Sequence, residues 1–224
     1  MYIENLQKKV YNTIKWRKSM IKTIEDLKIK YKDYSDVNGK IRREIMSGTY
    51  IPIIRGLYET DKTTPGYYLS SYIYGPSYLS FDYALSYYGM IPERVTNYTS
   101  ATYNKQKAKK YITPFGTYIY RDIPKAAYPY DILAIVENNY VFHIASKEKA
   151  LCDKLYSLKT VTSLKQLVKL IFEDLRVYSD EFFSLDLDKL SKLIPKYKSK
   201  NLMLLKKYIK GEAYANHRSD VEKI

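Results

Sequence analysis

The side chains best suited to chemistry in this 224-residue chain are cations near its N-terminus. Arg42 and Arg43 are adjacent, Lys40 precedes them, and Arg55 follows further along the chain. An arginine can pair its two N–H groups with the edge of guanine, and both arginine and lysine can bind phosphate. We therefore predict that these four side chains contact DNA. The alternative is that they form the solvated face of an ordinary helix.

A helix over residues 37–46 would present these cations in one direction. Val37, Ile41 and Ile45 fall on one stripe of that helix and are expected to face a core. The opposite face then carries Gly39, Arg42, Arg43 and Met46, with Lys40 on the flank. Because glycine has no side chain, Gly39 would let the backbone approach the duplex closely.

The order of elements around this helix predicts a winged helix-turn-helix over residues 1–60. Helical spacing indicates helices over residues 2–15 and 24–31, and Gly48 is expected to end the helix over 37–46. Thr23 and Asp26 form a plausible capping pair for the second helix. Apolar runs at 50–54 and 57–59 flank Arg55-Gly56, which indicates a hairpin with Arg55 at its tip. A small helical bundle is the alternative.

Residues 61–224 are predicted to form a mixed α/β C-terminal domain that ends in helices, so the expected fold class is α+β. Expected helices cover residues 67–74, 81–88 and 147–158, with Ser80 and Ser146 as N-caps of the last two, and three more lie within 163–209. Expected hairpins pair residues 109–113 with 117–122 and 132–136 with 140–144. We expect Tyr78, Phe81, Leu85 and Leu151 in the core.

A second basic run lies in this region, between Tyr103 and Tyr111. It consists of Lys105, Lys107, Lys109 and Lys110. These lysines are candidates to extend a DNA-contacting surface, because lysine neutralises phosphate charge. The alternative is a solvated loop before a strand.

Enzyme signals are weak, so we predict no enzyme activity, cofactor or metal. The chain has no Gly-rich phosphate loop and no Gly-x-Ser-x-Gly turn. Cys152 is expected to be a buried thiol and His143 a packed strand residue. Asp186 and Asp188 have the spacing of a metal-binding carboxylate pair, but they begin a helix, where acids stabilise the N-terminus. A nuclease remains an alternative supported only by charge and scattered acids.

Composition favours a cytoplasmic protein with a polyanionic partner. The formal net charge is +14, a single cysteine excludes an internal disulfide, and no stretch approaches a membrane span. The start of the sequence carries no apolar signal core. The chain has 27 tyrosines, and many of them are expected to lie half-buried, with packed rings and hydroxyls in water.

Several stretches together resemble the AbiEi family, the antitoxins of abortive-infection AbiE toxin–antitoxin systems. They are Gly56–Tyr58, Gly75–Leu85 with its continuation Gly89–Glu93, Thr113–Tyr120 and Ile144–Asp153. The chain departs from the family pattern at Lys147, where a proline often opens the helix, and its third helix has fewer arginines than many relatives.

The resemblance implies a two-domain antitoxin without catalytic residues. Its N-terminal winged helix would repress the toxin–antitoxin promoter by binding double-stranded DNA, usually at inverted repeats. Its C-terminal domain would counteract a nucleotidyltransferase toxin encoded beside it, often without a stable complex. A winged-helix module that binds protein, or a regulator without an antitoxin role, is the alternative.

Overall fold

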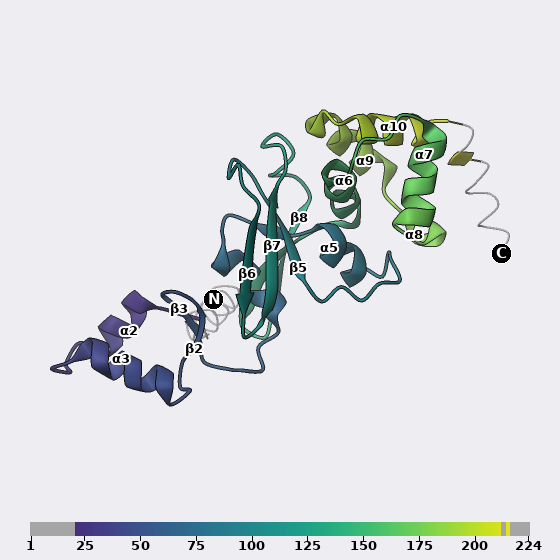
Figure 1. Cartoon of the computed structure of the whole chain (residues 1–224). Helices are drawn as coiled ribbons and strands as arrows, with labels where there is room; N and C mark the ends of the chain where they lie inside the picture. Colours follow the sequence, from purple (N-terminus) through teal and green to yellow (C-terminus); the bar gives the residue numbers. More distant parts are fainter. Residues whose placement is uncertain (1–20, 212–213, 216–224) are drawn as a thin grey trace, which may run out of the picture. The chain divides into compact units, whose positions relative to one another are not determined.

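The computed structural model describes residues 21–211 and 214–215, so the helix expected over residues 2–15 lies outside the described residues. The chain divides into two compact units (Figure 1). The first comprises Met1–Tyr68 with Thr113–Phe115 and Val136–Val141, and the second comprises the rest. Both helices and strands are present, which confirms the α+β class.

The described residues of the first unit form two helices and a small antiparallel sheet. Helix α2 spans Ile24–Lys30 and helix α3 spans Val37–Met46, and the sheet has the order β1 (Lys22–Thr23), β3 (Leu57–Glu59), β2 (Ile51–Ile54). Thr23 and Asp26 form the predicted capping box, in which each side chain accepts a hydrogen bond from the other residue's backbone N–H. Gly48 follows α3 with φ +79°, a conformation that glycine adopts without strain.

The predicted inner stripe of α3 faces a core of the first unit. Ile41 is buried there, and Val37 and Ile45 pack against the same cluster. The cluster itself consists of Leu27, Tyr31, Ile41, Tyr50 and Tyr58. The core therefore joins α2, α3 and the β2–β3 hairpin. Contacts with α2 and with the hairpin fix the orientation of α3.

A six-stranded sheet has the order β6-β7-β5-β4-β9-β8, and most of its residues belong to the second unit. Its strands are β4 (Tyr78–Leu79), β5 (Tyr98–Thr102), β6 (Lys109–Thr113), β7 (Gly116–Asp122), β8 (Ile132–Glu137) and β9 (Tyr140–Ala145). The two predicted hairpins, β6–β7 and β8–β9, are confirmed. The pairs β5–β7 and β4–β9 are parallel, and β4 pairs antiparallel with β5. The centre of the sheet therefore pairs strands that are not consecutive in the sequence.

Helices accompany this sheet, and most of them gather in the C-terminal part (Figure 1). The chain first forms η1 (Gly66–Leu69), α4 (Ser70–Ile73) and α5 (Phe81–Tyr87). It later forms α6 (Lys147–Ser157), α7 (Leu164–Lys169), η2 (Leu170–Asp174), α8 (Ser179–Phe183), α9 (Leu187–Leu193), η3 (Ile194–Tyr197) and α10 (Lys200–Ile209). No helix among the described residues is both long enough and apolar enough to cross a membrane.

The prediction of three helices over residues 163–209 is wrong. Four α-helices occupy that segment, and one of them is the short helix α8 at Ser179–Phe183. The chain restarts helices at short intervals because Asp186 caps α9 and Pro195 opens the turn η3. Likewise, the helix expected over 67–74 begins as a 3₁₀ turn.

Ser80 does precede α5, but its predicted capping role is wrong. Its side chain makes no cap hydrogen bond and instead donates to Asp153 Oδ2 at 2.7 Å. The N–H of Tyr83, in the first turn of α5, donates to Thr99 Oγ1 at 3.0 Å. A strand residue distant in sequence therefore caps this helix. Ser146 caps α6 as predicted, accepting from Lys149 N–H.

Candidate nucleic-acid interface

Helix α3 presents two unengaged guanidinium groups to solvent. Arg42 and Arg43 are exposed, and no ion pair or hydrogen bond ties either side chain to another described residue. Met46, on the same side of the helix, is 78% exposed. Because the core holds the opposite stripe, these side chains extend from a helix whose orientation is fixed. This is the geometry needed for a helix that inserts into a groove.

Lys40 behaves differently from the two arginines. Its ammonium pairs with Glu44 one turn along α3, and it lies 5.6 Å and 5.3 Å from the ring centroids of Tyr31 and Tyr34. The hydrogen bond from Lys40 lowers the pKa of the Glu44 carboxyl. Lys40 is therefore already engaged by protein groups that connect α3 to the end of α2. Its predicted role in DNA contact is untested, and its position suits orienting the helix.

The structure explains why position 39 is a glycine, which the sequence alone did not reveal. Asp36 caps α3, and its Oδ1 accepts a hydrogen bond from Gly39 N–H at 2.8 Å. A Cβ added to Gly39 would lie 1.7 Å from Asp36 Oδ2. Glycine therefore makes room for the capping carboxylate, whether or not the backbone also approaches a duplex.

Arg55 lies at the turn between β2 and β3, as predicted, and is exposed. Gly56 follows it with φ +83° and accepts a hydrogen bond from Ile24 N–H at 2.9 Å. That bond ties the turn to the start of α2. Behind α3, Lys30 Nζ donates to Tyr50 Oη at 2.6 Å, and this bond raises the pKa of Lys30. The first unit thus holds its helices and hairpin by polar as well as apolar contacts.

The second basic run belongs to the second unit and is only partly free. Lys105 Nζ donates to the carbonyl of Gly75 at 3.0 Å and lies over the ring of Tyr74. The other three side chains, Lys107, Lys109 and Lys110, are exposed. Lys109 and Lys110 are neighbours on β6, so they point to opposite faces of the strand. The run therefore cannot act as one continuous row of cations.

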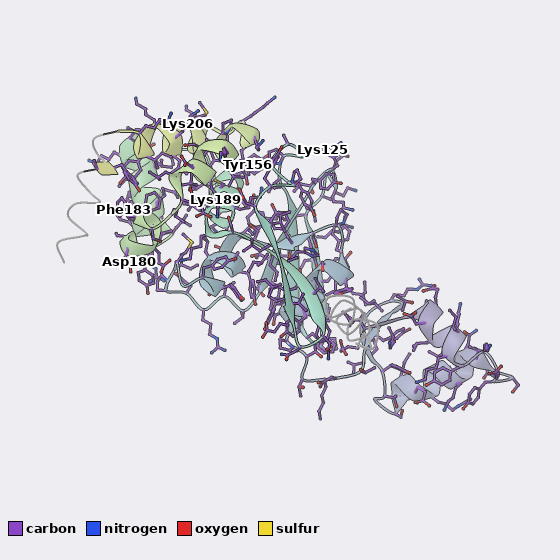
Figure 2. The ribbon with its side chains drawn as sticks, turned by 180° about the vertical axis from the view of Figure 1, so that it is seen from behind. Lys125, Tyr156, Asp180, Phe183, Lys189 and Lys206 are labelled. Atoms are coloured by element: carbon purple, nitrogen blue, oxygen red, sulfur yellow. The ribbon has the colours of Figure 1, made fainter. Side chains whose placement is uncertain are left out.

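Sequence reasoning missed a third basic region. Residues 189–210 contain eight lysines and no acidic residue, which is a signal that was readable in the sequence. Lys189 on α9 and Lys206 on α10 are among them (Figure 2). Lys196 lies 3.7 Å from the ring centroid of Tyr130, so that cation is engaged by protein. The helical part of the second unit thus contributes strongly to the positive charge of the chain.

Residues from two stretches that carry the AbiEi resemblance meet in one buried network. Tyr78 Oη and Ser80 Oγ both donate to Asp153 Oδ2, at 2.9 Å and 2.7 Å. Tyr197 Oη donates to Asp153 Oδ1 at 2.6 Å, and Lys149 Nζ lies 3.4 Å from the same oxygen. Lys149 and Asp153 are fully buried, and burial lowers the pKa of Lys149.

This network joins β4, α6 and η3 and leaves neither charge unpaired. Lys149 Nζ also donates to the carbonyl of Ala127 at 2.7 Å. A buried charge is tolerated when it is paired and hydrogen-bonded, and both conditions hold here. We interpret the network as a scaffold that fixes the second unit, because water and substrates have no access to it.

Several tyrosines, including two in this network, are buried more deeply than the half-buried position predicted for many of them. Tyr78, Tyr118, Tyr120 and Tyr197 are all at most 2% exposed. Tyr120 Oη donates to the carbonyl of Ser70 at 2.7 Å, and Tyr78 and Tyr197 donate to Asp153. Their hydroxyls are therefore satisfied by protein groups and not by water. The core-residue prediction for Tyr78, Phe81, Leu85 and Leu151 is confirmed.

The other residues that the sequence offered as chemical candidates have structural roles, and the prediction for His143 is wrong. Cys152 is fully buried as predicted, and burial raises the pKa of its thiol. Asp186 caps α9, accepting from Asp188 N–H and Lys189 N–H. His143 is exposed and not packed, because the alternation along β9 turns Phe142 and Ile144 inward. Among the described residues, no group of His, Cys, Asp and Glu could hold a metal ion.

Comparison with known proteins adds no family assignment. A scan against protein-family models finds no match, and a search of curated proteins finds no similar sequence.

Proposed function

We propose that this protein is an AbiE-type antitoxin that binds promoter DNA and represses its own operon. The observation that carries the proposal is the pair Arg42 and Arg43, exposed and unengaged on a helix that is held by a core on its other side. We propose that the first unit is a winged helix-turn-helix, with α3 as the recognition helix and the β2–β3 hairpin as the wing.

In this proposal, α3 enters the major groove and the two arginines contact base edges or flanking phosphates. Arg55, at the hairpin turn, contacts phosphate or the minor groove. Lys40 keeps α3 in its orientation through Glu44 and the rings of Tyr31 and Tyr34. The formal charge of +14 speeds encounter with DNA and supplies affinity that does not depend on sequence.

The second unit is proposed to counteract a nucleotidyltransferase toxin in the cytoplasm, without enzymatic activity of its own. Support comes from the AbiEi-like stretches, whose residues Tyr78, Ser80, Lys149 and Asp153 form one buried network. The proposal does not require a stable complex with the toxin.

A gel shift on the region upstream of the gene tests the repressor half. We expect a shift that random DNA competes poorly and that weakens steeply with salt as counterions are released. Replacing Arg42 and Arg43 together by Ala should remove base preference more than overall affinity. Arg94→Ala, an exposed arginine of the second unit, is the matched control.

If random DNA competes as well as the upstream region, or if the double substitution leaves specific binding intact, α3 does not recognise the operator sequence. No shift at all would direct attention to a protein partner for the first unit.

Co-expression with the neighbouring nucleotidyltransferase tests the antitoxin half. The full chain should restore growth, and the Arg42→Ala, Arg43→Ala variant should still do so under an unrelated promoter. Growth arrest that persists with well-expressed, folded protein would contradict the antitoxin role and leave the repressor role standing.

A further inference from the structure

The second unit contains a small cavity whose lining is largely aromatic and apolar. It has a volume of about 300 Å³ and is lined by Ser71, Pro76, Ser77, Tyr78, Tyr128, Ile132 and His143. That volume is at the lower end of the range for small-molecule sites, roughly 300–1,000 Å³. We propose that this cavity binds a nucleobase.

Ser77 is the first reason to expect a ligand with a polar edge. The residue is 6% exposed, and its hydroxyl is buried without a hydrogen-bond partner among the described residues. A buried hydroxyl that lacks a partner destabilises the folded protein, so such groups are nearly always satisfied. A ligand atom able to accept or donate a hydrogen bond would satisfy Ser77.

The walls of the cavity favour a flat ligand. The ring of Tyr128 contacts those of Tyr78 and Tyr103, with ring centroids 5.2 Å and 4.4 Å apart. Pro76 and Ile132 add apolar surface, and His143 supplies an exposed imidazole from β9. Aromatic faces stack on any of the bases, and hydroxyl and imidazole groups can pair with base edges.

The basic run of the second unit begins next to this cavity. Tyr103, which contacts Tyr128, is two residues before Lys105. Lys105 Nζ contacts the carbonyl of Gly75, whose chain neighbour Pro76 lines the cavity. A phosphate attached to the bound base would therefore meet positive charge. The base must be unpaired, because a base inside a duplex cannot enter a pocket of this kind.

A free nucleotide and an unpaired base in a single strand share this chemistry, and binding measurements on the full-length protein distinguish them. Calorimetric titration would use the monophosphates of adenosine, guanosine, cytidine and uridine one at a time. Fluorescence anisotropy would use labelled single-stranded RNA and DNA of mixed sequence, with a duplex of the same sequence for comparison. The variants are Ser77→Ala and His143→Ala. The control is Ser184→Ala, which changes an exposed serine at the C-terminal end of α8 that does not line the cavity.

We expect at least one nucleotide or single strand to bind. Ser77→Ala and His143→Ala should each weaken binding about three- to tenfold, the effect of one neutral hydrogen bond, whereas Ser184→Ala should have no effect. Binding of a monophosphate identifies free nucleotide as the ligand, and binding of single strands alone identifies a strand. Thermal melts of each variant establish that it is folded.

Absence of binding to every probe, or binding that neither variant weakens, would overturn the proposal and leave the cavity to water. The inference is independent of the repressor role, because Ser77→Ala should leave the operator gel shift unchanged. Failure of one proposal can therefore be told apart from failure of the other.

Discussion

Gly39 shows how strongly one residue can depend on a neighbour three positions away. Its missing side chain leaves space for the carboxylate of Asp36, which caps α3. The sequence alone suggested a role in approach to DNA, whereas the geometry supplies a reason in stability. The two roles are compatible, and only the second follows from the contacts.

We predict that Gly39→Ala and Asp36→Ala destabilise the protein by similar amounts, about 1 kcal/mol each, because either change removes the same cap. The double variant should cost little more than either single variant, since the interaction can be lost only once. Urea unfolding measures all three free energies. Asn38→Ala, an exposed neighbour, serves as the control, and strict additivity in the double variant would contradict the shared cap.

Ser80 and Ser146 look alike in the sequence but differ in the structure. Ser146 caps α6, so its replacement by Ala should cost about 1 kcal/mol. Ser80 donates to the buried carboxylate of Asp153, so Ser80→Ala removes a charge-assisted hydrogen bond and should cost more, roughly 1.5–3 kcal/mol. Denaturant unfolding of the two variants decides the order, and equal or reversed costs would argue against the network.

At the scale of elements, we expect the cations of helix α3 to have different roles. Arg42 and Arg43 are unengaged, whereas Lys40 is held by Glu44 and by the rings of Tyr31 and Tyr34. The guanidinium groups of Arg42 and Arg43 can therefore contact DNA, whereas the ammonium of Lys40 is already engaged by protein groups.

We predict that Arg43→Ala lowers the preference for operator over random DNA at least tenfold, about the effect of losing one good base contact. Lys40→Met should lower that preference less than Arg43→Ala does, because the ammonium it removes is directed at protein and acts on DNA reading only through the orientation of α3. Competition gel shifts on both variants provide the comparison. A larger loss of preference in Lys40→Met than in Arg43→Ala would reverse our assignment of the reading residues.

For the whole molecule, the buried tyrosines set an alkaline limit on stability. Burial raises the pKa of Tyr88, Tyr128 and Tyr208 to about 12. An unfolded tyrosine ionises near pH 10, so the unfolded chain releases protons before the folded chain does. Stability from these groups is complete below pH 10 and is lost as the pH rises toward 12.

We therefore predict a cooperative unfolding transition between about pH 10 and 12, in which tyrosinate absorbance appears together with loss of helix signal. A smooth titration of all tyrosines near pH 10, with the fold intact, would show that the buried hydroxyls are not protected.

The sequence by itself determined the local elements. Thr23 with Asp26, Gly48 and the Arg55-Gly56 turn act on residues near them in the chain, so helix and hairpin boundaries in the first unit follow from local chemistry. The stripe Val37, Ile41 and Ile45 also indicated which face of α3 is inward, and hence that Arg42 and Arg43 face outward.

Only the tertiary structure decided which distant residues meet. The antiparallel pairing of β4 with β5 brings Thr99 to the start of α5, and packing brings Ser80, Asp153 and Tyr197 together. Whether Lys40 is free or engaged and whether Ser77 has a partner are likewise settled by packing. Periodicity and capping act within a few residues, whereas these contacts depend on how strands and helices pack after the chain has closed long loops.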